Sequence, residues 1–283
     1  MSGALPAAGS HFADDWLTLR EAVDHRSRAH GLTFFAAEHL RRTAAGRHAR
    51  VVDLGAGRGS NLRYLAPRLH RPVAWRLLDQ DAELLAAAER AMPPDAGESC
   101  QLSAEIVDLA APLAPVLRDA DLVTASALID LVSRGWIDTL AETCAHAGAA
   151  VLITLSVDGR IQFSDADVDD AVVRRALARD QARDKGFGLA LGAAAPAVLI
   201  NALARCGYAV ATQPSDWQLG RDDAALARAL IAGWHSAATS QQPDQAERMA
   251  AWAARRVEAV ERGRARLCIG HVDVLGLPNP RRR

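Results

Sequence analysis

The sequence predicts an α/β fold: a doubly wound, seven-stranded, mostly parallel sheet with an antiparallel last strand, and a helical lid built from N-terminal helices and two insertions. Three observations lead to this prediction. Apolar runs of strand length alternate with helical segments through residues 50–155, as in βα units. A glycine-rich turn at 55–59 follows the first of these runs. Two helical segments separate the last two expected strands, where a short turn would be enough.

The expected elements follow one another along the chain. A helical pattern covers about 12–43, with Gly31 as its break. Further helices are expected at 60–69, 81–91, 112–118, 136–147, 166–184, 194–206, 222–238 and 243–263, and strands at 50–54, 73–79, 101–107, 120–126, 149–155, 208–213 and 266–275. The polar composition of 156–167 indicates a loop, and that of 236–245 indicates a bridge between the last two helices.

The turn Asp53-Leu54-Gly55-Ala56-Gly57-Arg58-Gly59 is the most informative stretch. Its glycines let the backbone approach a ligand where any Cβ would collide, and Asp53 places an acceptor at the carboxyl end of the strand. Asn61 lies in the first turn of the helix that follows. A dinucleotide fingerprint would require a third glycine at position 60, which is Ser60, and it does not call for an acid at 53. The turn therefore favours a different ligand.

This stretch resembles motif I of the class I, Rossmann-like S-adenosylmethionine (SAM)-dependent methyltransferases. The resemblance implies that Asp79, at the end of the second strand, binds both ribose hydroxyls, and that Asp108, at the end of the third, accepts from the adenine amino group. The exit of strand four, Ser126-Ala127, matches motif IV and is expected beside the methyl donor. The complete predicted set of SAM-binding residues is Asp53, Gly55, Ala56, Gly57, Asn61, Asp79, Gln80, Asp108, Leu109, Ser126 and Ala127.

The same resemblance divides the chain into a SAM-binding core and a lid. The core is expected to comprise 49–155, the helix and strand at 194–213, and the last strand with its tail at 266–283. The lid is expected to comprise the N-terminal segment 1–48 and the helical insertions 156–193 and 214–265.

Four residues of the lid are candidate substrate contacts: Trp16, Arg20, Arg28 and Trp217. Their surroundings, 16–28 and 215–220, resemble elements of a subset of bacterial small-molecule methyltransferases whose N-terminal helices fold over the SAM pocket. The arginines would meet the methionyl carboxylate or an anionic substrate, and Trp217 would be a flat wall for a ring. The alternatives are a solvated charge ladder through Asp24, at i, i+4 and i+8, and a structural anchor at Trp217.

Methyl transfer from a sulfonium is an in-line displacement in which positioning does most of the work, so a general base is optional. Asp130 and Asp158, at the exits of strands four and five, are the candidate catalytic residues. The alternatives are a helix cap or loop solvation for Asp130 and a turn for Asp158. His11, His25 and His30 are imidazoles able to take a proton, and each has a structural alternative.

The amino-acid composition limits the kinds of partner that the protein is expected to bind. Half of the residues are apolar, 24% are charged and the formal net charge is −1, so there is no electrostatic footprint for nucleic acid or an anionic membrane. The four cysteines lack metal-ligand spacing, so no metal is expected. The start lacks a signal-peptide pattern and no segment has the apolar length of a membrane span, which favours a cytoplasmic protein. A monomer or a homodimer is expected.

Taken with the resemblance, these features predict a SAM-dependent methyltransferase that delivers a methyl group to O or N of a small-molecule metabolite held under the lid, with S-adenosylhomocysteine as product. The alternative is a non-catalytic protein that binds SAM or S-adenosylhomocysteine as a sensor or idle partner, because no residue pattern defines an acceptor site. A third alternative, an NAD-type oxidoreductase, is disfavoured by Ser60 and by the position of Asp53.

Overall fold

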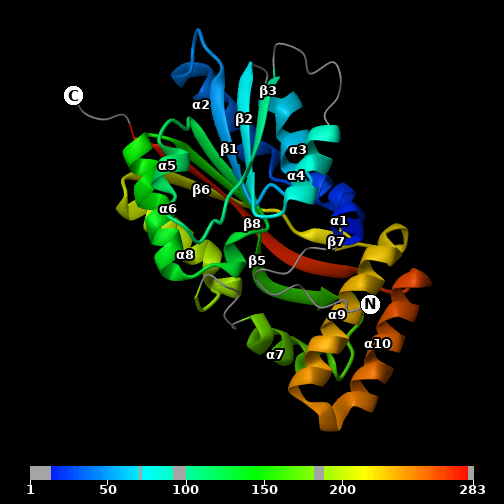
Figure 1. Cartoon of the computed structure of the whole chain (residues 1–283). Helices are drawn as coiled ribbons and strands as arrows, with labels where there is room; N and C mark the ends of the chain where they lie inside the picture. Colours follow the sequence, from blue (N-terminus) through cyan, green and yellow to red (C-terminus); the bar gives the residue numbers. More distant parts are fainter. Residues whose placement is uncertain (1–13, 70–71, 92–99, 182–187, 280–283) are drawn as a thin grey trace.

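The computed structural model describes residues 14–69, 72–91, 100–181 and 188–279. The strands are β1 Ala49–Leu54, β2 Val73–Asp79, β3 Cys100–Ile106, β4 Leu122–Ser126, β5 Ala150–Phe163, β6 Tyr208–Pro214, β7 Trp217–Leu219 and β8 Leu267–Pro278. Within these residues they form one eight-stranded sheet of order β3-β2-β1-β4-β5-β8-β6, and β7 pairs with β8 off this path (Figure 1). Neighbours from β3 to β5 are parallel, and β8 is antiparallel to β5, β6 and β7. The predicted fold class is confirmed, with β7 as an additional short strand.

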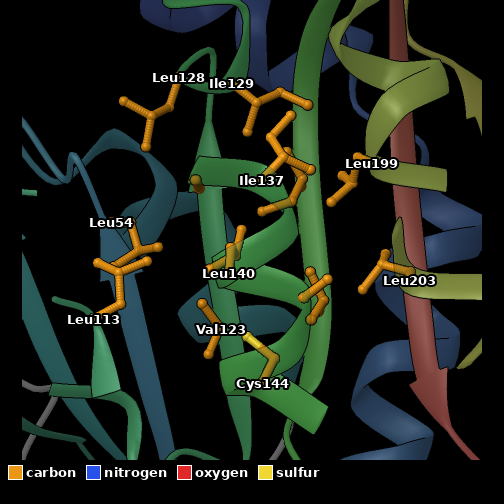
Figure 2. Close-up of a cluster of buried hydrophobic side chains, with 14 of the residues drawn as sticks. Leu54, Leu113, Val123, Leu128, Ile129, Ile137, Leu140, Cys144, Leu199 and Leu203 are labelled. Carbon is orange, nitrogen blue, oxygen red and sulfur yellow. The ribbon is translucent and has the colours of Figure 1, made fainter. Parts of the chain in front are cut away.

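Helices cover both faces of the sheet because its strands are apolar on both sides. Successive residues of a strand point to opposite faces, so Val51 and Val52 belong to different buried clusters. The cluster of Val51 includes residues of α2 (His30–Thr43), α3 (Ser60–Leu69) and α4 (Ala82–Arg90). The cluster of Val52 includes residues of α5 (Ala114–Leu117), α6 (Arg134–Ala147) and α8 (Ala195–Arg205), and Figure 2 shows it.

The N-terminal pattern forms two helices, α1 (Asp14–Ser27) and α2, which meet at Ala29 and not at the expected Gly31. Ala29 has an extended backbone and donates its N–H to the carboxylate of Asp273 at 2.9 Å, which turns the chain. Gly31 lies inside α2, where a Cβ would come within 3.0 Å of the Gln213 side chain. α2 packs in a core cluster of the sheet, whereas α1 contacts the other lid elements β7 and α9 (Ala224–Gln241).

The loop expected at 156–167 is largely a continuation of β5, so this part of the prediction is wrong. β8 supplies a partner along the added length: Ile161 pairs with Ile269 and Phe163 with Leu267. The register between the two strands shifts after Ile153 and again after Val157. Such irregularities bend a strand pair, and here they coincide with the left-handed backbone of Leu155, φ +54°.

The extended ends of β5 and β8 support a lid made of α1, β7, α7 (Asp170–Gln181), α9 and α10 (Ala246–Glu261) (Figure 1). These elements share a third buried cluster, distinct from the two on the faces of the sheet. The lid helices therefore pack on one another, as their apolar stripes require. α9 runs through most of the expected polar bridge. Among the described helices, none combines the length and the apolar character needed to cross a bilayer.

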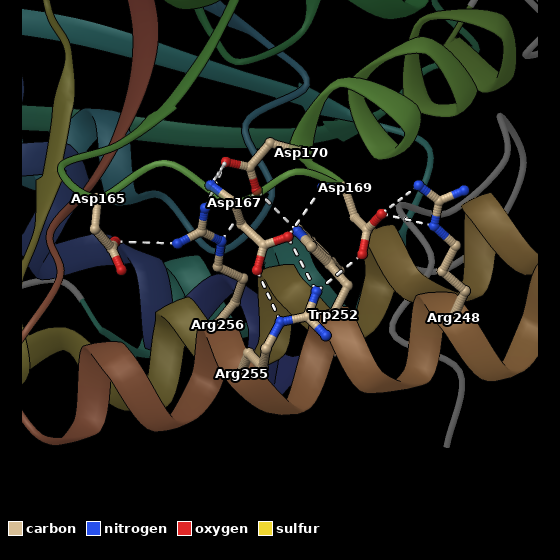
Figure 3. Close-up of polar contacts among 8 residues, drawn as sticks. All are labelled: Asp165, Asp167, Asp169, Asp170, Arg248, Trp252, Arg255 and Arg256. Atoms are coloured by element: carbon tan, nitrogen blue, oxygen red, sulfur yellow. Dashed lines mark hydrogen bonds and ion pairs between the residues drawn. The ribbon is translucent and has the colours of Figure 1, made fainter.

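Ion pairs fasten the loop before α7 to α10 (Figure 3). Arg256 is 2% exposed, pairs with Asp165 at 3.0 Å and with Asp170, and lies 4.1 Å from the ring centroid of Phe163. Arg255 pairs with Asp167 at 2.8 Å beside it. Separating a buried arginine from its carboxylates is strongly unfavourable, so α7 and α10 are held together as one unit.

Candidate functional site

The glycine turn joins β1 to α3 through a left-handed backbone. Gly57 has φ +50° and donates its N–H to Oδ2 of Asp79 at 2.8 Å. Gly59 has φ +76°, and a Cβ there would lie 3.0 Å from Cβ of Ala88 on α4. Both positions therefore favour glycine because of the left-handed backbone, and close packing against α4 is a second reason at Gly59. The N–H of Ala56 adds a bond to the carbonyl of Leu78 at 3.1 Å, which holds the turn against the end of β2.

Asp79 ends β2 with both carboxylate oxygens engaged. Oδ2 accepts from Gly57, and Oδ1 accepts from the N–H of Asp81 at 3.0 Å. Burial raises the pKa of Asp79, and these two N–H groups oppose the rise because they stabilise the carboxylate. The side chain is thus oriented by backbone, and its remaining lone pairs can accept further hydrogen bonds.

The exit of β3 runs beside Asp79, because the N–H of Val107 donates to the Asp79 carbonyl at 2.9 Å. Asp108 follows; it is exposed, and its Oδ1 accepts from the N–H of Ala110 at 2.8 Å. Of the two other residues predicted here, Gln80 is exposed and Leu109 is buried. The predicted residues of the turn and of the exits of β2 and β3 therefore meet at one edge of the sheet.

A buried polar chain lies beneath the turn. Asn61 donates to Oδ1 of Asp53 at 2.7 Å, and its Oδ1 accepts from Nη1 of Arg28 at 2.9 Å. Arg28 is 3% exposed and Asp53 is 1% exposed. Within the described part of the chain, Oδ2 of Asp53 and both Nε and Nη2 of Arg28 have no hydrogen-bond partner, although Arg28 Nε lies 3.8 Å from Asp273. Asp53 and Arg28, linked through Asn61, thus each keep unsatisfied buried atoms, and Asp53 lies in β1 beside β4, where the strand order reverses.

The protonation state of Asp53 can change near neutral pH. Burial raises its pKa to about 7, against the opposing effects of the hydrogen bond from Asn61 and the charge of Arg28. A cationic group near Oδ2 would favour the ionised carboxylate, so binding of a cation and loss of the Asp53 proton are coupled.

One face of α1 lies along the turn and the start of α3. Residues 18, 21, 25 and 28 are spaced for one helix face. They meet a continuous stretch of chain: Thr18 accepts from Arg58, Glu21 pairs with Arg63 at 2.6 Å, His25 Nε2 lies 3.0 Å from the Ser60 carbonyl, and Arg28 donates to Asn61. α1 therefore covers the glycine turn, and Arg28, directly after the helix, continues this set of contacts.

A second face of α1 turns toward β7. Arg20 pairs with Asp24 at 2.8 Å and its guanidinium lies 5.0 Å from the ring centroid of Trp217. Trp217 donates its indole N–H to Asp24 at 3.1 Å. The expected ladder is thus reduced to the Arg20–Asp24 pair, because Arg28, one further turn along, is directed to Asn61.

A cavity of about 150 Å³ lies between the exits of β4 and β5 and the lid. Its lining includes the predicted residues Trp16, Arg20, Ala127, Asp130 and Trp217, whereas Arg28 and Asp158 do not line it. Ala127 has φ +53°, and its N–H donates to the carbonyl of Thr154 at 2.9 Å. Ser126 ends β4 directly before it. The exit of β4 therefore connects the predicted cofactor edge with the cavity under the lid.

The two predicted catalytic acids have different surroundings. Asp130 lies in the short helix η2 (Ile129–Leu131), is half-buried and lines the cavity. Asp158 lies within the extended β5 and pairs with Arg160 at 2.6 Å, which also pairs with Asp216 at 2.7 Å. A Cβ at Gly270 of β8 would lie 2.1 Å from Asp158 Oδ1, so the side chain of Asp158 packs directly against the backbone of β8 at Gly270. The continuation of β5 makes Asp158 a structural ion pair partner.

The described candidate histidines of the N-terminal segment, His25 and His30, do not line the cavity. His25 contacts Ser60, and His30 is exposed with Nδ1 3.0 Å from the Tyr64 hydroxyl. His11 lies outside the described residues.

Sequence reasoning missed two buried residues of β8, His271 and Asp273. His271, 3% exposed, lines the cavity, and Asp273, 1% exposed, accepts from the N–H groups of Leu155 at 2.7 Å and Ala29 at 2.9 Å. A signal was present: two polar residues at i and i+2 in an apolar strand share one face. Buried polar side chains on one strand face mark either a site or a structural junction.

No family model matches the chain, and no curated protein matches it. It is similar to the cyclopropane synthase MmaA2 of Mycobacterium tuberculosis, at a TM-score of 0.47 and 11% identity, over 93% of this chain and 94% of that one. It is also similar to the YcgJ protein of Bacillus subtilis, at a TM-score of 0.46 and 14% identity, over 87% of this chain and 99% of that one. A third similar structure is phosphoethanolamine N-methyltransferase 2 of Haemonchus contortus, in complex with phosphomonomethylethanolamine and S-adenosylhomocysteine. Its TM-score is 0.44 and its identity is 12%, over 95% of this chain and 59% of that one. At such values the likenesses assign no ligand or reaction to this chain.

Proposed function

We propose that this chain is a SAM-dependent methyltransferase that transfers a methyl group to O or N of a small-molecule metabolite. The observation that carries the proposal is the polar chain beneath the glycine turn, where Arg28 and Asp53 each keep unpartnered atoms within the described residues. An α-amino acid presents a carboxylate and an ammonium group together, and these complement one side chain each. Without such a ligand, the buried atoms carry an uncompensated desolvation cost.

The other predicted contacts fit the rest of SAM. The carboxylate of Asp79, oriented by Gly57 and Asp81, is suited to two vicinal hydroxyls. The exposed carboxylate of Asp108 is suited to an amino group. When bound, SAM supplies a methyl group on a sulfonium, an electrophile that requires no protein nucleophile.

The cavity is the proposed acceptor site. Its lining includes Ala127, which follows β4 beside the cofactor edge, and helices of the lid close it from the other side. The lining would hold an acceptor in a restricted orientation, which is the main contribution that a protein makes to this displacement. Its volume suits a small molecule and excludes a folded protein or a duplex.

A labelling experiment tests the proposal and its alternative. The protein is incubated with SAM labelled in the methyl group and with a metabolite extract, and mass spectrometry identifies any small molecule that gains the label. A labelled product supports methyl transfer. SAM binding without any labelled product supports the sensor or idle partner, and absence of SAM binding rejects both.

Replacing Asp79 by alanine is expected to weaken SAM binding by about 1.5–3 kcal/mol, the range for hydrogen bonds to a charged group. The fold should persist, because Asp79 is only half-buried at the end of β2. Calorimetric titration measures the change, with Asp119→Ala as control, since that carboxylate is 70% exposed and lies before β4 at the opposite edge. Wild-type affinity in Asp79→Ala would remove this residue from the site.

SAM binding is expected to weaken about fivefold between pH 7 and pH 6, as follows from an Asp53 pKa of about 7 in the free protein. The raised pKa means that more of the free protein carries the proton at pH 6, and that proton must leave before the carboxylate can pair with the ammonium of SAM. Titration at both pH values, in buffers of different ionisation enthalpy, measures affinity and proton release together. Asp53→Asn should bind more weakly and lose the pH dependence; an equal dependence in both proteins would assign it to another group.

A further inference from the structure

We propose that the cavity binds a compact, uncharged aromatic molecule of about one ring, and that Nε2 of His271 accepts a hydrogen bond from a hydroxyl or amino group on that ring. The proposal rests on the proposed function in one respect, namely that this molecule is the methyl acceptor. It adds the chemical class of the acceptor and a substrate-binding residue on β8.

The size and lining of the cavity define the ring. An apolar cavity of about 150 Å³ is large enough to hold a benzene-sized molecule. Trp16, Trp217 and Trp234 contribute flat indoles to its lining, and leucines at 131, 155 and 177 add aliphatic surface. Indole faces favour stacked or edge-on contacts with another ring, which aliphatic chains of the same volume cannot make.

The charges around the cavity favour a neutral ligand. Arg20 is paired with Asp24 at 2.8 Å, and Arg160 is paired with both Asp158 and Asp216. Arg174 is exposed at the rim, and Asp130 adds a carboxylate to the lining. The buried walls therefore carry no excess of positive charge that would hold an anion.

The hydrogen bond of His271 determines which ring nitrogen is the acceptor. Nδ1 lies 3.0 Å from the carbonyl oxygen of Ile269. A carbonyl oxygen only accepts, so Nδ1 carries the hydrogen and Nε2 carries the lone pair. Within the described chain, Nε2 has no hydrogen-bond partner, while the ring lines the cavity and packs 5.0 Å from that of Trp217. Nε2 is thereby the available acceptor on a wall that is otherwise mostly apolar.

His271 stays neutral in this position. Burial, together with the charge of Arg20, lowers its pKa to about 4. The neutral ring therefore remains a hydrogen-bond acceptor at physiological pH, and it orients a hydroxyl or amino group while being too weak a base to remove its proton in the ground state.

Two probes and two variants test this inference. Phenol and anisole share one ring, but only phenol donates a hydrogen bond. Quenching of the tryptophan fluorescence of the full chain gives both dissociation constants, and phenol should bind about fivefold more tightly than anisole. In His271→Asn the amide can keep the bond to the Ile269 carbonyl but has no atom at the place of Nε2, so the preference should vanish. In His271→Gln the side-chain oxygen can reach that place, so part of the preference should return.

Equal affinities for phenol and anisole in the wild-type protein, or an unchanged preference in His271→Asn, would overturn the inference; so would the absence of binding by either probe up to about 10 mM. Should His271→Asn not fold, ¹⁵N-histidine NMR of the wild-type protein replaces it. The Nδ1-protonated tautomer, with an Nε2 resonance that shifts with phenol and not with anisole, supports the inference, and the opposite tautomer rejects it. SAM titration of the same samples keeps the two ideas apart: probe binding without SAM binding rejects the proposed function alone.

Discussion

Asp273→Ala is expected to lower the free energy of unfolding by about 3–5 kcal/mol, the cost of breaking a buried charged network by removing one partner. The carboxylate of Asp273 accepts from the N–H groups of Leu155 and Ala29 and lies 3.8 Å from Arg28. Alanine would leave both N–H groups without an acceptor and would remove a counter-charge from an arginine that is 3% exposed. The left-handed backbone of Leu155 and the junction between α1 and α2 would lose the same support.

Urea denaturation measures this loss. Asp273→Asn keeps one acceptor oxygen and should lose about half as much stability. Asp138→Ala is the control, because this residue forms a surface pair with Arg205, whose side chain is 60% exposed, and it should change stability by less than about 1 kcal/mol. If Asp273→Ala and the control lost equal stability, Asp273 would not be the junction between sheet and lid that its bonds indicate.

Gly57→Val is expected to weaken SAM binding at least about a hundredfold, since each 1.4 kcal/mol is a factor of ten. A left-handed backbone costs an L-residue about 1–2 kcal/mol, and a branched side chain raises that cost. A Cβ at this position would already lie 3.6 Å from Cδ1 of Leu17 on α1, so the valine methyls would press on that helix. The N–H that orients Asp79 would move with the turn, and the proposed ribose site would lose its geometry.

Gly46→Val is the matched control. Gly46 has φ +79°, and a Cβ at this position would meet no described atom within 4 Å. It lies before β1, at the edge of the sheet away from the site. Both variants should melt at a lower temperature, but only Gly57→Val should lose SAM affinity in calorimetric titration. Near-normal binding by Gly57→Val would place the turn further from the ligand than proposed.

Local patterns in the sequence determine the two-sided core and the turn. The apolar run at 50–54 predicts a strand, and the structure places its residues Val51 and Val52 in different buried clusters. The spacing of Gly55, Gly57 and Gly59 predicts a tight turn, and all three have positive φ. The acid at position 79 ends its strand as expected. Periodicity and turn chemistry act over a few residues, so they can be read before the chain is folded.

The cavity that is the proposed acceptor site, and the polar residues around it, were decided only by the tertiary structure. β5 continues through a polar stretch because β8, more than a hundred residues later, offers a partner, and this turns Asp158 from an exit residue into part of a strand. Arg20 lies in α1 and Arg28 directly follows that helix, but they have different partners: Arg28 donates to Asn61 at the proposed cofactor edge, and Arg20 lies over the ring of Trp217 at the cavity. Whether a polar side chain such as His271 or Asp273 binds a ligand or satisfies a distant N–H depends on partners that only folding brings within hydrogen-bond distance, and no local pattern contains them.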